Sequence, residues 1–152
     1  MSKISVLMSV YKKENPEYLR ASLESILVQT RTADEILLIE DGPLTQELYQ
    51  VVAEYQKKCD YLHVHAMEQN VQLGRALAKG VELCQYDLIA RMDTDDIAMP
   101  DRLEKEEAYM EAHPEVDVVG GAIREFNDEG TIDRVKNMPK TQEEILEYVK
   151  VR

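Results

Sequence analysis

Short apolar runs alternate with amphipathic segments over the first two thirds of the chain. Runs of β-branched and aliphatic residues predict strands at Ile4–Val10, Glu35–Glu40, 61–65 and 86–92. Between these runs, apolar residues recur at the three- and four-residue spacing of a helix. The first predicted helix begins at Asn15-Pro16. The second carries Leu48, Val51, Val52 and Tyr55, and the third covers 70–83. The pattern is therefore typical of alternating strands and helices.

The last third is more polar and less regular. A charged helix is predicted over 100–113 and should end at Pro114. A fifth strand is predicted over 116–123, followed by a hairpin turn at 127–130 that leads into Thr131-Ile132. Thr141 and Glu144 have the spacing of a capping box that opens a last helix.

Continuous apolar strands between helices predict an α/β fold whose sheet is buried on both faces. Ligands of such sheets bind beyond the carboxyl ends of the strands. Polar motifs stand at three of these ends: Ser9-Val10-Tyr11, Glu40-Asp41-Gly42 and the acidic segment 93–96. We expect all three to lie on one binding edge.

Composition narrows the class of ligand. The 152 residues carry a formal net charge of −12 and no basic stripe, which argues against binding to nucleic acid. No apolar run is long enough to span a bilayer, and the first residues do not resemble a secretory signal, so we expect a cytoplasmic protein. An acidic protein that binds phosphates needs a metal, helix N-termini or a few placed cations.

The acidic segment is the strongest candidate for such a metal site. Asp93, Asp95 and Asp96 place three carboxylates within four residues, where they repel one another and favour a cation. Oxygen-only ligands select Mg²⁺ or Mn²⁺ over zinc. A solvated acidic loop, or a helix N-terminus favouring aspartate, explains the same residues without a metal.

Three other ligand-binding motifs fit poorly. A calcium loop that starts at Asp93 would need glycine at Ala98 and a helix before it, where a strand is predicted. A receiver domain would need its acidic pair after the first strand, whereas Glu40-Asp41 follows the second. A dinucleotide-binding fold needs a glycine-rich turn after the first strand, where this chain has Ser9-Val10-Tyr11.

Five motifs in order resemble family 2 inverting glycosyltransferases from Ile4 to about Gly121. They are the segments 5–11, 22–30, 40–42 and 70–74, and the segment 91–96 followed by 99–103. The resemblance implies the GT-A fold, a Rossmann-like, mostly parallel sheet flanked by helices in three αβα layers. Lys12, Glu40 and Pro43 depart from the residues that are common in the family.

The resemblance also implies roles for single residues. Ser9 and Tyr11 would lie against the nucleobase, and Asp41 would accept a hydrogen bond from a uracil-type base. Arg75 would reach the base or the phosphates. Asp95 would lie near the ribose and the metal, Asp96 would ligate the metal, and Asp93 would begin the motif.

The implied reaction transfers a sugar from a UDP-type donor, with inversion, to a glycan or lipid-linked acceptor in polysaccharide biosynthesis. It uses Mn²⁺ or Mg²⁺ and a separate general base. The resemblance places that base and the acceptor pocket in a second half, so we expect residues 1–152 to be one GT-A domain truncated before it. Peripheral membrane contact would then involve the missing region. The alternative is a non-catalytic module that retains the nucleotide and metal site.

Overall fold

A computed structural model of the chain describes residues 2–127 and 130–150. The chain divides into two compact units, Met1–Ala108 and Tyr109–Arg152, which are described separately below. Helix α4 (Arg102–Ala112) begins in the first unit and ends in the second.

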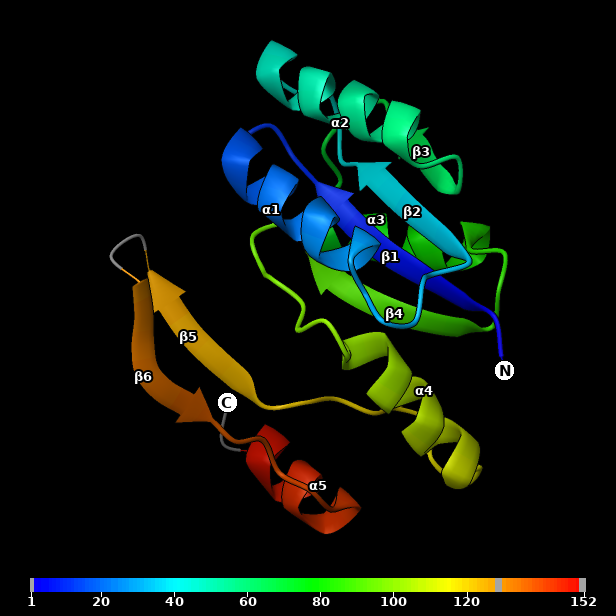
Figure 1. The fold of residues 1–152 in the computed structure, drawn as a ribbon, viewed down its shortest axis with the longest axis vertical. Helices are drawn as coiled ribbons and strands as arrows, with labels where there is room; N and C mark the ends of the chain where they lie inside the picture. Colours follow the sequence, from blue (N-terminus) through cyan, green and yellow to red (C-terminus); the bar gives the residue numbers. More distant parts are fainter. Residues whose placement is uncertain (1, 128–129, 151–152) are drawn as a thin grey trace. The chain divides into compact units, whose positions relative to one another are not determined.

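The first unit is built on a four-stranded parallel sheet (Figure 1). Its strands are β1 (Ile4–Val10), β2 (Glu35–Glu40), β3 (Leu62–Ala66) and β4 (Leu88–Asp93). Their order in the sheet is β3-β2-β1-β4, so the chain starts in the interior and adds strands on both sides. All four strands point the same way, and their carboxyl ends share one edge.

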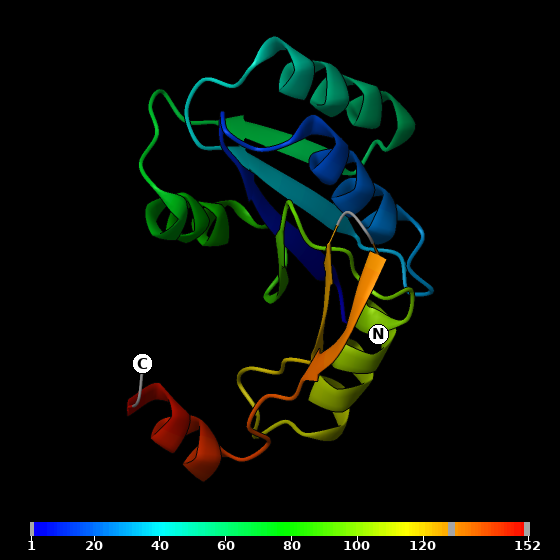
Figure 2. The ribbon, with the colours of Figure 1, turned by 90° about the vertical axis from the view of Figure 1, so that its left-hand side faces the viewer.

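Helices cover both faces of this sheet (Figure 2). Helices α1 (Pro16–Leu27) and α2 (Gln46–Lys58) lie on one face, and α3 (Leu73–Leu83) lies on the other. Alternate residues of β1 serve the two faces: Val6 and Met8 pack in the larger core with Leu23 of α1, whereas Leu7 packs with Ala76 of α3. The predicted α/β fold, with helices on both sides of a parallel sheet, is confirmed.

Local signals explain where two of the helices begin. Asn15 caps α1 by accepting a hydrogen bond from the Glu17 backbone N–H at 2.9 Å, and Pro16 occupies the first helical position. Thr45 caps α2 in the same way through the Leu48 N–H. Helix α3 starts at Leu73, three residues later than predicted, because residues 70–72 form a loop held by Asp41.

The second unit contains a two-stranded antiparallel sheet and a short helix. Strand β5 (Ile123–Asn127) pairs with β6 (Gly130–Lys136), and α5 (Gln142–Lys150) follows. The predicted capping box is present: the Thr141 hydroxyl accepts from the Glu144 N–H, and the Glu144 carboxylate accepts from the Thr141 N–H, both at 3.2 Å. In the predicted turn at 127–130, Asp128 and Glu129 lie outside the described residues.

The strand predicted over 116–123 is wrong. Residues 116–122 are irregular, and only Ile123 belongs to a strand, because pairing begins where β6 lies alongside. The apolar run before it ends in Gly120-Gly121, which have no side chain to pack and no neighbouring atoms within 4 Å of a Cβ built there. Val118, in the same run, is 86% exposed. β-propensity alone therefore did not make a strand without a partner to pair with.

None of the helices described here is both long enough and apolar enough to cross a membrane.

Candidate functional site

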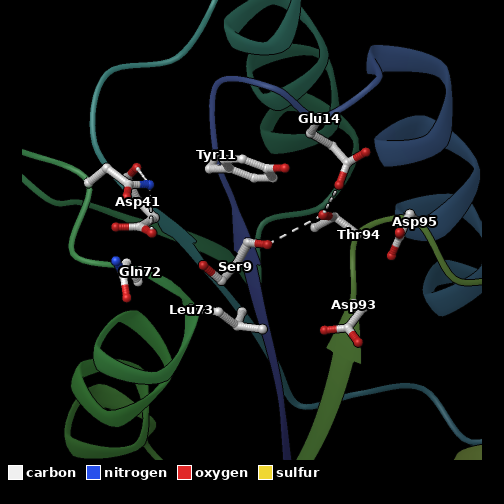
Figure 3. A pocket seen from close by; sticks show the side chains of 10 residues that line it. Ser9, Tyr11, Glu14, Asp41, Gln72, Leu73, Asp93, Thr94 and Asp95 are labelled. Atoms are coloured by element: carbon white, nitrogen blue, oxygen red, sulfur yellow. Dashed lines mark hydrogen bonds between the residues drawn. The ribbon is translucent and has the colours of Figure 1, made fainter.

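A pocket of about 440 Å³ opens at the carboxyl edge of the first unit's sheet (Figure 3). It is lined by Ser9, Tyr11, Glu14, Asp41, Asn70, Gln72, Leu73, Asp93, Thr94 and Asp95. These residues come from the ends of β1 and β4, from the loops after β1, β2 and β4, and from the start of α3 with the loop before it. The volume is within the range of small-molecule sites in proteins.

The strand register brings the predicted motifs together. Ser9 of β1 lies beside Ile39 of β2 and Asp93 of β4, so the three strands end side by side. The Asp41 N–H donates to the Val10 carbonyl at 2.8 Å and extends this alignment by one residue. Five of the predicted site residues, Ser9, Tyr11, Asp41, Asp93 and Asp95, therefore line one pocket.

Asp41 joins the end of β2 to the loop before α3. It is 4% exposed, and its two carboxylate oxygens accept from the Val71 N–H at 2.6 Å and from the Asn70 side-chain amide at 2.9 Å. Each carboxylate oxygen still has a second lone pair. Asp41 thus shapes the pocket and retains capacity to accept a hydrogen bond from a ligand.

Gly42 allows the 69–70 backbone to come close to this strand end. Its φ is +85°, and a Cβ built there would lie 2.5 Å from the Asn70 nitrogen. Only glycine fits both the backbone angle and the space.

Gln72 has an unusual backbone conformation at the pocket wall. Its φ of 72° and ψ of 154° lie in a region that is essentially restricted to glycine, at a cost on the order of 1–3 kcal/mol. The strain is imposed from both sides. Asp41 holds Val71, and the Gln72 carbonyl accepts from the Ala76 N–H at 3.0 Å in the first turn of α3.

Tyr11 presents its ring to the pocket and is 44% exposed. The Glu14 N–H donates to the Tyr11 carbonyl at 3.0 Å, which closes a turn after β1 and fixes the backbone that carries the ring. In Figure 3, the Tyr11 ring lies between Asp41 on one side and Glu14 on the other. A half-exposed ring in such a position can stack on a planar ligand.

Thr94 links the acidic segment to the loop after β1. It is 3% exposed, and its hydroxyl donates to Glu14 Oε2 at 2.6 Å, with the Ser9 carbonyl 3.3 Å away (Figure 3). The sequence motifs assign no role to the side chains of Glu14 and Thr94. Thr94 stands inside the acidic segment 93–96, whereas the one signal for Glu14 is its position a few residues after a strand end.

The acidic carboxylates differ in their surroundings. Asp93 forms an ion pair with Arg91, two residues earlier on the same strand. Although Asp96 is exposed, partial loss of hydration, followed by the charges of Asp95 and Asp93, raises the pKa of Asp96. The segment therefore concentrates negative charge that a cation would relieve.

These carboxylates fit a hard cation as a partial site. Across residues 2–127 and 130–150, no group of three or more His, Cys, Asp or Glu side chains is arranged to hold a metal ion. Mg²⁺ commonly needs only one or two carboxylates when substrate phosphates and water supply the other ligands. Asp95, at the pocket, and its neighbour Asp96 are the residues that could supply these one or two carboxylates.

Two predicted residues lie outside the pocket lining. Within the described part of the chain, neither Arg75 nor Asp96 is among the lining residues. Arg75 lies in the first turn of α3, where its N–H donates to the Gln72 carbonyl at 3.1 Å. The Asp96 N–H lies 3.4 Å from the Asp93 carbonyl, so Asp96 follows in the turn after β4.

Three buried polar side chains, two on α1 and Gln29 just beyond its end, hold the acidic segment and the chain after it. Ser22 donates to the Asp93 carbonyl at 3.0 Å, and Ser25 accepts from the Ala98 N–H at 3.0 Å. Gln29 donates to the Met99 carbonyl at 2.7 Å and accepts from the Leu103 N–H at 3.1 Å. The three side chains are at most 6% exposed, so α1 and the residues just after it determine the path of this segment.

Nearly the whole of this chain aligns with curated relatives. The chain is 46% identical over 99% of its length to an uncharacterized glycosyltransferase of Haemophilus influenzae, and 43% identical over 97% to the amylovoran biosynthesis glycosyltransferase AmsE of Erwinia amylovora. It is 35% identical over 99% to the Escherichia coli UDP-Gal:alpha-D-GlcNAc-diphosphoundecaprenol beta-1,3-galactosyltransferase. It covers 56%, 55% and 54% of these relatives, about half of each.

Solved structures share the fold. TarS residues 1–349 of S. aureus, in complex with UDP-GlcNAc, matches 74% of this chain and 32% of its own, with a TM-score of 0.65 and 23% identity. The mannosyltransferase PcManGT of Pyrobaculum calidifontis, in complex with GDP-Man and Mn²⁺, matches 80% of this chain and 34% of its own, with a TM-score of 0.65 and 15% identity. Both neighbours are glycosyltransferases of the GT-A type, which confirms the predicted fold class.

The sequence profile described as Glycosyl transferase family 2 matches residues 5–151, nearly the whole chain. Together with the pocket at the sheet edge and the identities above, this match confirms the resemblance, and the chain belongs to glycosyltransferase family 2.

Proposed function

We propose that this chain is the donor-binding part of a glycosyltransferase and that its pocket binds a UDP-type nucleotide-sugar with Mn²⁺ or Mg²⁺. The observation that carries the proposal is the arrangement of one pocket. An aromatic ring and a buried acceptor, Tyr11 and Asp41, line it together with the acidic carboxylates of Asp93 and Asp95. A nucleoside diphosphate has the same two ends, a planar base and a charged diphosphate.

Asp41 and Tyr11 would bind the base. The remaining lone pairs of Asp41 suit the imide N–H of uracil, because an ionised carboxylate only accepts hydrogen bonds. Tyr11 supplies a face for stacking, and Ser9 lies between this end of the pocket and the acidic end. The E. coli relative carries UDP-Gal in its name, and TarS was solved with UDP-GlcNAc, which supports a uridine donor.

Asp95 and Asp96 would hold the cation against the diphosphate, and Asp93 is less available because it pairs with Arg91. A bound cation offsets the negative charge that grows on a leaving diphosphate. PcManGT was solved with Mn²⁺, which supports a divalent ion in this fold. The hydrogen bonds of Thr94 and Ser22 would hold the acidic segment in position beside the diphosphate.

We propose that sugar transfer proceeds with inversion to a glycan or lipid-linked acceptor, as part of polysaccharide biosynthesis. The acceptor hydroxyl would attack the anomeric carbon opposite the diphosphate and lose its proton to a carboxylate base. The amylovoran enzyme and the E. coli relative, whose name includes a diphosphoundecaprenol acceptor, support this acceptor class. We assign the base to no residue of this chain.

Replacement of single carboxylates tests the two ends of the pocket separately. Asp96→Ala should abolish the Mn²⁺-dependent part of UDP binding in calorimetric titrations without lowering the melting temperature. Asp87→Ala is the matched control, because Asp87 is an exposed aspartate just before the amino end of β4. Asp41→Asn should weaken UDP and uridine alike. An unchanged UDP affinity in Asp96→Ala would refute the metal assignment.

A further inference from the structure

Gln72 is the one described residue other than glycine that has a positive φ, and it lines the pocket. Its side chain makes no capping hydrogen bond to α3 although it occupies the N-cap position. Gln72 is exposed and lies at the pocket wall next to Asp41 (Figure 3).

We propose that Gln72 is a specificity-determining residue whose side-chain amide N–H donates a hydrogen bond to the C4 carbonyl oxygen of the bound uracil, the position at which cytosine carries an amino group. The inference rests on the proposed binding of a uridine nucleotide in this pocket. Asp41 and Gln72 lie on the same side of the pocket, separated by Val71, which Asp41 binds through its backbone N–H. They would present an acceptor and a donor side by side.

This pair of groups matches uracil better than the other pyrimidine. Uracil has an imide N–H flanked by two carbonyl oxygens, so an acceptor beside a donor satisfies adjacent atoms of its edge. Cytosine replaces that N–H with an acceptor nitrogen, which would face the Asp41 carboxylate and leave both acceptors without a proton between them. Gln72 adds the second contact that a single carboxylate lacks.

The backbone strain gives the proposal an unusual test. Glycine adopts the Gln72 backbone angles without strain, so Gln72→Gly should stabilise the fold. If the side chain reads the base, the same substitution should weaken UDP binding. Stability and affinity would then move in opposite directions, which a purely structural role for Gln72 does not produce.

The experiment compares Gln72→Gly and Gln72→Ala with the wild-type chain by thermal unfolding and by titration with UDP and CDP at fixed Mn²⁺. Both variants should bind UDP about three- to tenfold more weakly, the effect of one lost hydrogen bond, and should discriminate less against CDP. Only Gln72→Gly should raise the melting temperature, by roughly 3 °C, because alanine retains the Cβ that causes the strain. Gln69→Ala, an exposed glutamine outside the pocket lining, should change none of these values.

The possible results distinguish a failure of the Gln72 assignment from a failure of the proposed donor site. Wild-type UDP affinity and UDP-over-CDP preference in Gln72→Ala would overturn the role of Gln72 and leave the donor site intact. A wild-type chain that binds no UDP would overturn the proposed function, and the role of Gln72 with it.

Discussion

The hydroxyl of Thr94 lies 2.6 Å from the carboxylate of Glu14, eighty residues earlier in the chain, and donates a hydrogen bond to it. This contact joins the loop after β1, which carries Tyr11, to the acidic segment after β4. The two proposed ends of the donor site are thus connected through a buried side chain, and not through the sheet alone.

Thr94→Val should therefore weaken UDP binding in the presence of Mn²⁺ by about tenfold, since the charge-assisted hydrogen bond that positions the acidic segment is lost. Thr94→Ser keeps the hydroxyl and should bind UDP like the wild type. Titration with uridine, which has no diphosphate, should show a smaller difference between the variants. Equal UDP affinities for the valine and serine variants would contradict a positioning role for Thr94.

Gln29 should contribute mainly to stability. Gln29→Met keeps the length of the side chain but leaves the Met99 carbonyl and the Leu103 N–H without their partner in a buried site. We expect the free energy of unfolding to fall by about 2–4 kcal/mol, measured by urea denaturation. A loss below about 0.5 kcal/mol would show that other groups or water replace these hydrogen bonds.

Gly42→Ala should destabilise the first unit by about 1–3 kcal/mol and weaken UDP binding as well. The added Cβ would press on the Asn70 backbone nitrogen and displace the loop that Asp41 holds. Gly74→Ala is the matched control, because a Cβ at Gly74 meets nothing within 4 Å. If both variants unfold at the same urea concentration, the close approach at Gly42 is not what requires glycine.

The pH dependence of the free energy of unfolding should reveal the titration of the Glu40 carboxyl. Burial raises the pKa of the Glu40 carboxyl above its ordinary value of 4.5, and the side chain is 6% exposed. The folded state therefore retains this proton when the unfolded state has lost it, and stability falls as pH rises from the unfolded pKa through the folded one.

Glu40→Gln removes this titration and keeps the shape of the side chain. The variant should be more stable than the wild type at pH 7.5, and the difference should shrink when the pH falls below about 4, where both side chains are neutral. Urea denaturation at the two pH values measures it. A pH-independent difference between the two proteins would contradict a buried, ionised Glu40.

Much of the fold and part of the site could be predicted from sequence, and the exceptions have physical reasons. The strand ends at Ser9, Asp41 and Asp93 were visible because short apolar runs stop there, and parallel pairing then brings them together. The irregular path of 116–122 was not visible, because a strand needs a partner and the apolar pattern does not reveal one.

The backbone conformation of Gln72 and the Thr94–Glu14 contact could not be predicted from sequence for a related reason. The positive φ of Gln72 arises because Asp41 holds one side and α3 the other, so no local residue preference signals it. The Thr94–Glu14 pair depends on two loops that meet only in the folded sheet. Sequence therefore indicated which strand ends carry the chemistry, but not the contacts that set its geometry.

Calorimetric titration of the wild-type chain with UDP, in Mn²⁺ and again in excess EDTA, tests the donor-site proposal most directly. We expect saturable binding of UDP with Mn²⁺, at least tenfold weaker binding in EDTA, and much weaker binding of GDP under both conditions. UDP binding that is unaffected by EDTA would contradict the metal site at Asp95 and Asp96, and no binding of UDP under either condition would contradict the donor site as a whole.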